Sequence, residues 1–176
     1  MFFSIADLEK RKIHFEVDYP PGEIDLLDPN LNQVGSIQAK GIVELLSHTL
    51  GEVRIQGHIQ AAVEAPCDRC LEPARNEIDS DFDLFYRPAE TGPLMEEMEV
   101  AEGEIEIAFY EDDRIELEDV LREFILLALP MQWVCGAECK GICPVCGQNR
   151  NTSVCHCEVK PVDDRWACLL YTSRCV

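Results

Sequence analysis

The amino-acid sequence predicts an α+β fold: an antiparallel β-meander forming an open, barrel-like sheet, with one packed amphipathic helix and a C-terminal cysteine-rich zinc knuckle. Three observations carry this prediction. Apolar and polar residues alternate over several segments between residues 13 and 109, the period of strands with one buried face. A segment near residue 120 instead has the helical period. Six of the ten cysteines lie between residues 135 and 157.

The alternation places strands along most of the first 90 residues. Residues 13–19 form the first strand and residues 37–45 a second. The longest alternation runs over residues 53–65, where the apolar residues at odd positions share one face. After a turn at residues 67–73, the alternation resumes over residues 77–86. Because short turns join these consecutive strands, we expect an antiparallel meander.

A segment without periodicity separates these strands from the predicted helix. Residues 87–104 contain two prolines, two glycines and many glutamates, so we expect an acidic loop. Residues Ile105, Ile107 and Phe109 then predict one more short strand. Pro130 ends the helix, whose apolar stripe we expect to cover the sheet. That stripe consists of Leu117, Val120, Leu121, Phe124, Ile125 and Ala128.

We expect two parts in the chain. Residues 1–130 form the antiparallel β domain with its acidic loop and helix, and residues 131–176 form a zinc-binding tail that packs on it. No apolar run approaches the roughly 20 residues that span a bilayer. The first residues also lack the layout of a secretory signal, so we expect a cytoplasmic protein.

The chain is strongly acidic, with 34 acidic and 15 basic residues and a net charge of −19. Residues 77–130 alone hold 18 acids and 3 bases. Such a surface repels phosphate and suits a basic protein partner, although charges of this kind can also serve only solubility. We expect the acidic segment to contact such a partner through Glu96, Glu97, Glu99, Asp112 and Asp113.

The C-terminal cysteines predict a local zinc site. In a chain without a secretion signal, cysteines favour metal binding over disulfides, because cytosolic thiols stay reduced. The pattern C-P-x-C-G is followed by C-x-C, whose two thiols face the same side of an extended segment while His156 faces away. Gly147 permits the positive φ that lets backbone N–H groups point at the thiolates. The predicted ligands are Cys143, Cys146, Cys155 and Cys157.

A second zinc site is predicted from cysteines about 65 residues apart in the chain. One pair follows the longest predicted strand, and the other follows the helix, whose end could return to that turn. The predicted ligands are Cys67, Cys70, Cys135 and Cys139. The alternatives for the first pair are free thiols or a redox Cys-x-x-Cys. We place Cys168 in a short terminal helix capped by Asp163 and assign no role to Cys175.

Enzymatic function is not expected. The sequence lacks the motifs of phosphate-binding loops, dinucleotide folds, serine hydrolases and zinc proteases. Four sulfur ligands in each site also leave no position for an activated water. The non-enzymatic alternatives to an acidic adaptor are a thiol redox sensor and a zinc-ribbon RNA-binding protein. The basic face of such an RNA-binding protein would consist of Lys140, Arg150, Lys160, Arg165 and Arg174.

Four motifs occur in order along the chain: C-D-R-C-L-E-P at 67–73, L-A-L-P at 127–130, C-K-G-I-C-P-V-C-G-Q-N at 139–149 and D-D-R-W-A at 163–167. Together they resemble the YceD-like family of large ribosomal RNA subunit accumulation proteins. The resemblance implies a non-enzymatic role in making or stabilising large-subunit ribosomal RNA during ribosome assembly. We therefore expect a factor with one or two zinc ions that contacts a large-subunit precursor, a basic ribosomal protein or an assembly factor, and takes no small-molecule substrate.

Overall fold

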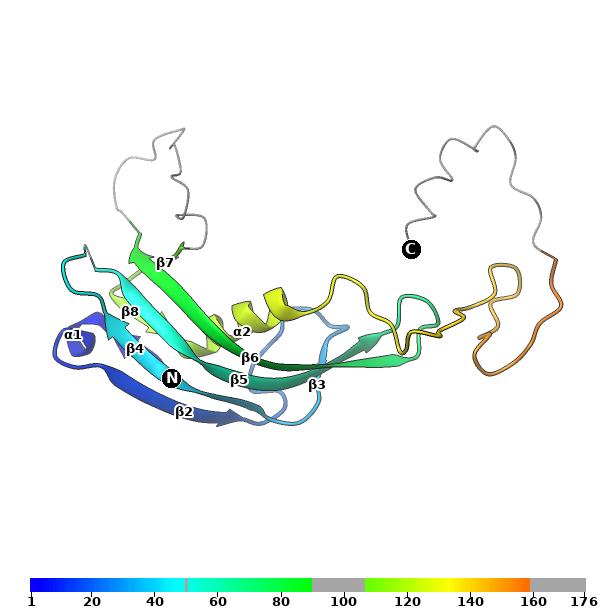
Figure 1. The fold of residues 1–176 in the computed structure, drawn as a ribbon, viewed down its shortest axis with the longest axis horizontal. Coiled ribbons are helices and arrows are strands. Elements are labelled where there is room, and N and C mark those ends of the chain that lie inside the picture. The colour runs from blue at the N-terminus through cyan, green and yellow to red at the C-terminus, as the bar shows by residue number, and fades with distance from the viewer. Residues whose placement is uncertain (50, 90–106, 159–176) are drawn as a thin grey trace, which may run out of the picture.

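A curved β-sheet forms the body of the protein in a computed structural model, which describes residues 1–49, 51–89 and 107–158 (Figure 1). Strands dominate the described residues, and helices are few. In chain order the elements are β1 (Phe2–Ser4), α1 (Ile5–Leu8), β2 (Ile13–Tyr19), β3 (Asn32–Gln33), β4 (Ile37–Leu45), β5 (Val53–Pro66), β6 (Pro73–Pro88), β7 (Ile107–Tyr110), β8 (Arg114–Glu116) and α2 (Leu117–Ala128).

The main sheet is open, with the strand order β2-β4-β5-β6-β7, and β3 pairs with β5 outside this path. The pairings from β2 to β6 are antiparallel, as the alternation predicts. The last strand differs: β7 runs parallel to the final residues of β6, with Phe85 opposite Ile107. An entirely antiparallel sheet was therefore a wrong prediction. Parallel pairing needs a long connection between the two strands, and the residues between Pro88 and Ile107 supply it.

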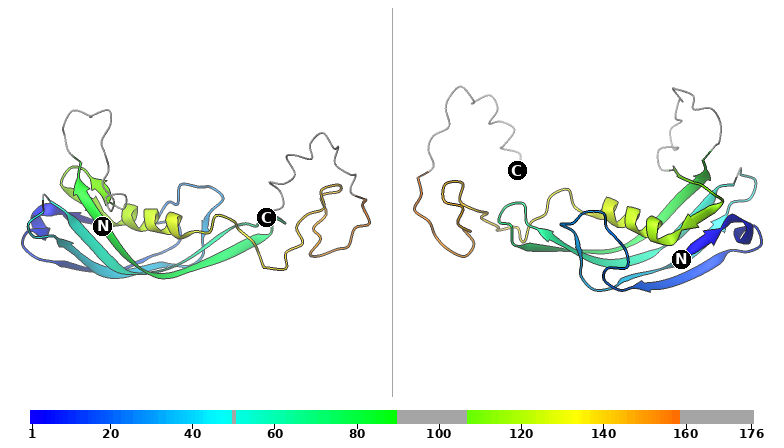
Figure 2. Two further views of the ribbon diagram at one scale, coloured as in Figure 1. Left: turned by 45° about the horizontal axis from the view of Figure 1, so that its top comes forward. Right: turned by 180° about the vertical axis from the view of Figure 1, so that it is seen from behind.

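Helix α2 lies on the concave side of the sheet (Figures 1 and 2). Leu117, Leu121 and Ile125 of the predicted stripe are fully buried, and each such side chain contributes about 1.5–3 kcal/mol when removed from water. Phe124 packs against Phe82 of β6, with ring centroids 5.4 Å apart. The helix ends at Ala128 because the next residue precedes a proline, which disfavours helical backbone there.

Two glycines face each other at the centre of the sheet, Gly41 on β4 and Gly57 on β5. Their outer neighbours in the same row are Phe15 and Phe82. A Cβ atom at Gly57 would lie 2.4 Å from the Lys40 carbonyl oxygen and 2.9 Å from the Phe82 ring. The phenyl rings therefore occupy the space that side chains at the two glycines would need.

Three short strands, β1, β7 and β8, depart from the predictions. In β7 the buried residue is Tyr110, whose hydroxyl donates to the Gly51 carbonyl oxygen at 2.8 Å, while Phe109 is 64% exposed. The predicted short strand is confirmed over residues 107–110, but its buried residue is Tyr110 and not Phe109. Ile105 lies outside the described residues. Strands β1 and β8, of three residues each, pair with each other and are too short to show a period. The predicted acidic loop is described only over residues 87–89.

None of the helices within the described ranges is long and apolar enough to cross a membrane.

We expect Gly57→Ala to destabilise the protein by more than about 2 kcal/mol, because the new methyl group meets backbone that cannot move without opening the ladder. Chemical denaturation would measure the loss. Gly136→Ala is the matched control, since nothing lies within 4 Å of a Cβ atom there. Equal stability of the two variants would contradict the close packing described for the glycine row.

Candidate metal centres

Eight cysteines form two groups of four thiols, and the Sγ atoms of each group lie within 4.8 Å of one another. The tip group consists of Cys67, Cys70, Cys135 and Cys139, and the tail group of Cys143, Cys146, Cys155 and Cys157. The structure thus brings together the two sets that the spacing suggests. Four sulfurs at this separation could hold a metal ion in each group.

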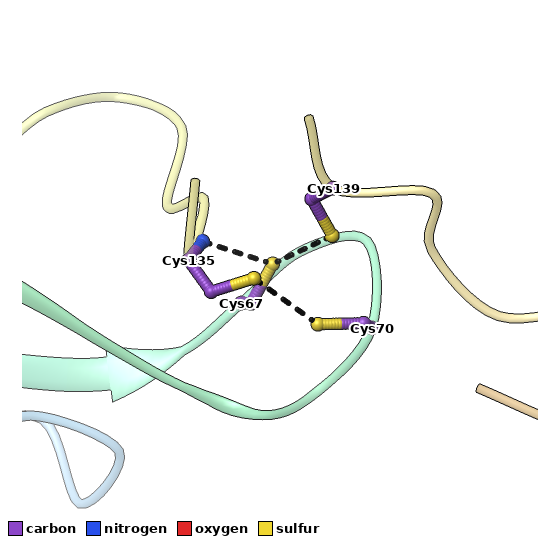
Figure 3. A group of neighbouring side chains, drawn as sticks. All are labelled: Cys67, Cys70, Cys135 and Cys139. Carbon is purple, nitrogen blue, oxygen red and sulfur yellow. Dashed lines mark hydrogen bonds between the residues drawn. The ribbon is translucent and has the colours of Figure 1, made fainter. Parts of the chain in front are cut away.

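The tip group joins two distant parts of the chain (Figure 3). Cys67 and Cys70 lie in the turn between β5 and β6, and Cys135 and Cys139 follow α2. The Sγ atoms of Cys67 and Cys139 are 3.9 Å apart, and those of Cys70 and Cys135 are 3.5 Å apart. Sulfurs at 2.3 Å from a central ion in a tetrahedron are about 3.8 Å apart, so one small ion fits between these four.

Backbone hydrogen bonds fix the tail against the β5–β6 turn. The Trp133 carbonyl oxygen accepts from the Asp68 N–H at 2.8 Å, and the Trp133 N–H donates to the Asp68 carboxylate at 2.8 Å. Further along, the Ile142 N–H donates to the Arg69 carbonyl oxygen at 2.8 Å. The Trp133 side chain also packs on the buried pair Cys67 and Cys70. These contacts bring the second pair of thiols to the first.

The two Cys-x-x-Cys turns share one backbone geometry. The Cys67 N–H donates to the carbonyl of the residue five positions later at 2.8 Å, and the Cys67 carbonyl accepts from the N–H four positions later at 2.9 Å. Cys143 makes the same two bonds at the same distances. The residue after each second cysteine has positive φ: Leu71 at 64° and Gly147 at 72°. The sequence predicts this conformation at Gly147 but gives no sign of it at Leu71.

Thiol ionisation is uneven within each group. Burial alone would raise the pKa of Cys67, but surrounding backbone N–H groups outweigh burial and lower it to about 6. Backbone N–H groups likewise lower the pKa of Cys143 to about 6. In contrast, hydrogen bonding to a neighbouring thiol raises the pKa of Cys135 to about 12, and the same cause acts at Cys157, also to about 12. Four thiolates therefore need a cation among them to ionise together.

Two asparagines connect the groups, and sequence reasoning missed both. The Asn151 side-chain amide donates to Cys139 Sγ at 3.4 Å, and its oxygen accepts from the Lys140 N–H at 2.7 Å. The Asn149 amide donates to the Glu72 carboxylate at 3.2 Å. The N-R-N sequence after the second Cys-x-x-Cys could have indicated a turn held by these side chains, because asparagines commonly stabilise turns in this way.

The other predicted site residues do not gather in the described part of the chain. Asp112 and Asp113 are exposed in the turn between β7 and β8, with positive φ of 54° and 51°. Lys140 and Arg150 are exposed beside the thiol groups. The remaining predicted residues lie outside the described ranges: Glu96, Glu97, Glu99, Lys160, Asp163, Arg165, Cys168, Arg174 and Cys175.

We expect Leu71→Gly to stabilise the protein by about 1 kcal/mol, because a non-glycine residue pays a steric cost at positive φ and this side chain is 67% exposed. Thermal unfolding of the metal-loaded protein would show a higher midpoint. Leu71→Ala retains the steric cost and should leave the midpoint unchanged. A lower midpoint for Leu71→Gly would contradict the assigned backbone geometry.

Comparison with known proteins matches residues 55–170, which contain both thiol groups, to the family described as large ribosomal RNA subunit accumulation protein YceD. An uncharacterized protein of Mycobacterium tuberculosis is 32% identical over 67% of this chain and 54% of its own length, and a Mycobacterium bovis protein matches equally. The chloroplastic large ribosomal RNA subunit accumulation protein YCED homolog 1 of Zea mays is 29% identical over 64% of this chain and 46% of its own. The chain spans about half the length of these relatives. No solved structure matches it significantly.

Proposed function

This chain belongs to the family of large ribosomal RNA subunit accumulation proteins, YceD, and from that premise we propose that it is a non-enzymatic, zinc-binding factor that supports the accumulation of large-subunit ribosomal RNA. The observation that carries the proposal is the pair of four-thiol groups within the matched segment. The family indicates the process, which is the accumulation of large-subunit ribosomal RNA. The thiol groups indicate the structural role of a bound metal in this chain.

Zinc is the ion that the geometry favours. All the candidate ligands are sulfur, which selects zinc or iron–sulfur chemistry among common metals. The Sγ separations of 3.5 and 3.9 Å suit a single central ion, whereas the cysteines of a multinuclear cluster bind different irons and lie farther apart. Structural zinc contributes about 10–16 kcal/mol of apparent folding free energy in small modules. We infer that zinc in the tip group holds the tail on the sheet.

A structural rather than catalytic role follows from the ligand count. Four thiolates complete a tetrahedral shell, so an ion in either group keeps no open position for water or substrate. The net charge of −19 disfavours binding of RNA phosphates by the whole surface. The partner that fits such a surface is a basic ribosomal protein or assembly factor bound to the large-subunit precursor.

Direct RNA binding by the tail is the second candidate, because Lys140 and Arg150 are exposed close to the thiol groups. Affinity capture of the chain from its own cells, with and without ribonuclease, separates the two candidates. Basic proteins retained after ribonuclease treatment support the adaptor role. Their complete release supports RNA contact through the tail.

We expect two zinc ions per chain after purification in reducing buffer. Cys70→Ser should remove one equivalent through the tip group, and Cys146→Ser the other through the tail group, because three thiolates hold zinc far more weakly than four. Elemental analysis with free-thiol titration measures this directly. Cys175→Ser, which is in neither group, should retain both ions. Zinc-free protein with reversibly oxidised thiols would instead support the redox-sensor alternative.

In cells that lack the chain, we expect the ratio of large-subunit to small-subunit ribosomal RNA to fall. Expression of the intact chain or Cys175→Ser should restore the ratio, whereas the double variant Cys70→Ser with Cys146→Ser should not, since its tail is no longer held. Quantitative electrophoresis of total RNA gives the readout. An unchanged ratio after deletion contradicts the function, and full rescue by the double variant contradicts the role of zinc.

A further inference from the structure

One long edge of the main sheet has no strand beside it in the described part of the chain. Strand β6 pairs with β5 along almost its whole length, from Pro73 to Tyr86. On its other side only residues 85–88 pair, with β7. No backbone hydrogen bond to another described segment occurs on that side between residues 73 and 84. Unpaired edges of this kind are templates for the addition of another strand.

The register identifies which backbone groups this edge offers. In an antiparallel ladder, alternate residues direct both N–H and C=O to the same side. The Ala62 carbonyl accepts from the Val34 N–H at 2.8 Å and so faces away from β6. Its partner Glu77 must then face away from β5. The Ala89 N–H, at another odd position, donates to the Tyr110 carbonyl at 2.9 Å on that same side. The free groups thus belong to Arg75, Glu77, Asp79, Asp81 and Asp83.

Four of these five residues are acidic, and their side chains lie on the exposed face of the sheet. The Glu77 and Asp81 side chains are 72% and 90% exposed. Three of the acids contact polar residues of β5: Asp83 accepts from Arg54 at 2.8 and 2.6 Å, and Asp79 and Asp81 both contact His58. The fourth acid, Glu77, pairs with Arg75 of the same strand at 2.9 Å. All four carboxylates stay at least 45% exposed, so they remain open to a basic partner.

The other face of the edge offers an apolar contact. Leu127 on α2 is 82% exposed. It lies one helical turn beyond Glu123. Burial, and after it the nearby Glu123 carboxylate, raise the pKa of the Tyr86 hydroxyl on β6, so this flank of the helix faces β6. An added strand would therefore meet carboxylates with one set of alternate side chains and an apolar residue with the other.

We propose that the free edge of β6, residues 75–83, binds an extended segment of a protein partner by strand addition, and that this segment carries Lys or Arg at alternate positions. The identification of that partner with a basic protein of the large subunit rests on the proposed function. Nine strand residues span roughly 30 Å, enough for a specific backbone ladder. A second copy of this edge does not fit, because it would place acids opposite acids.

The test uses a fluorescent synthetic peptide of alternating lysine and valine, titrated into the zinc-loaded full chain. Asp81→Pro removes an outward N–H without touching the ladder to β5. It should weaken peptide binding at least ten-fold more than Asp81→Ala, which loses the same carboxylate but keeps the N–H. Glu16→Pro is the control on the opposite edge, because the carbonyl of its β4 partner Lys40 faces β5. It should leave the affinity unchanged.

A second arm works even if Asp81→Pro unfolds. Two peptides are compared, one N-methylated on the odd-numbered amides and one on the even-numbered amides. Their affinities for the chain should differ at least ten-fold, since only one set of amides faces β6. Equal binding of the two sets, equal effects of Asp81→Pro and Asp81→Ala, or weakening by Glu16→Pro would overturn the proposal. If a variant loses peptide binding at this edge and still restores the ribosomal RNA ratio, the edge is not the partner site, and the proposed function stays intact.

Discussion

The four Sγ atoms of each cysteine group lie within 4.8 Å of one another, and as four thiolates they would repel one another. Backbone N–H groups lower the pKa of one thiol in each group to about 6, while hydrogen bonding to a neighbouring thiol raises that of another to about 12. A divalent cation among four thiolates would offset half of their charge and lie close to all four sulfurs. Residues 131–158 contain no helix or strand, so hydrogen bonds and the two thiol groups are what tie them to the rest of the chain.

The tip group lies outside the main hydrophobic core, in a small buried cluster of its own that Trp133 joins to that core. Strands β5 and β6 extend beyond the part of the sheet that β4 and α2 cover, and of the described strands only β3 joins them there (Figure 1). A two-stranded ribbon is marginally stable by itself. The tip group closes the end of this ribbon through Cys67 and Cys70, both buried. A metal ion in the tip group would therefore serve two structures: it would hold the tail, and it would stabilise the hairpin that carries it.

Features that depend on neighbouring residues in the chain could be predicted from the sequence. Features that depend on contacts between distant segments could not. The alternation over residues 53–65 and the stripe of α2 each bury a continuous face, so their periods are visible. The tail group lies within 15 residues, whereas the tip group joins segments that only the fold brings together. The parallel pairing of β7 and the positive φ of Leu71 have no local signature, since the first depends on a distant strand and the second on the Cys-x-x-Cys turn.

The proposed zinc centres would organise the chain around the β5–β6 hairpin. The proposed strand edge and ribosomal role both depend on that organisation. X-ray absorption at the zinc edge of the purified full chain tests the zinc centres most directly. We expect a single shell of four sulfurs at about 2.3 Å around each of two ions. A nitrogen or oxygen ligand in place of a sulfur, such as His156, or a chain that retains no zinc, would contradict the assignment of two four-thiolate centres.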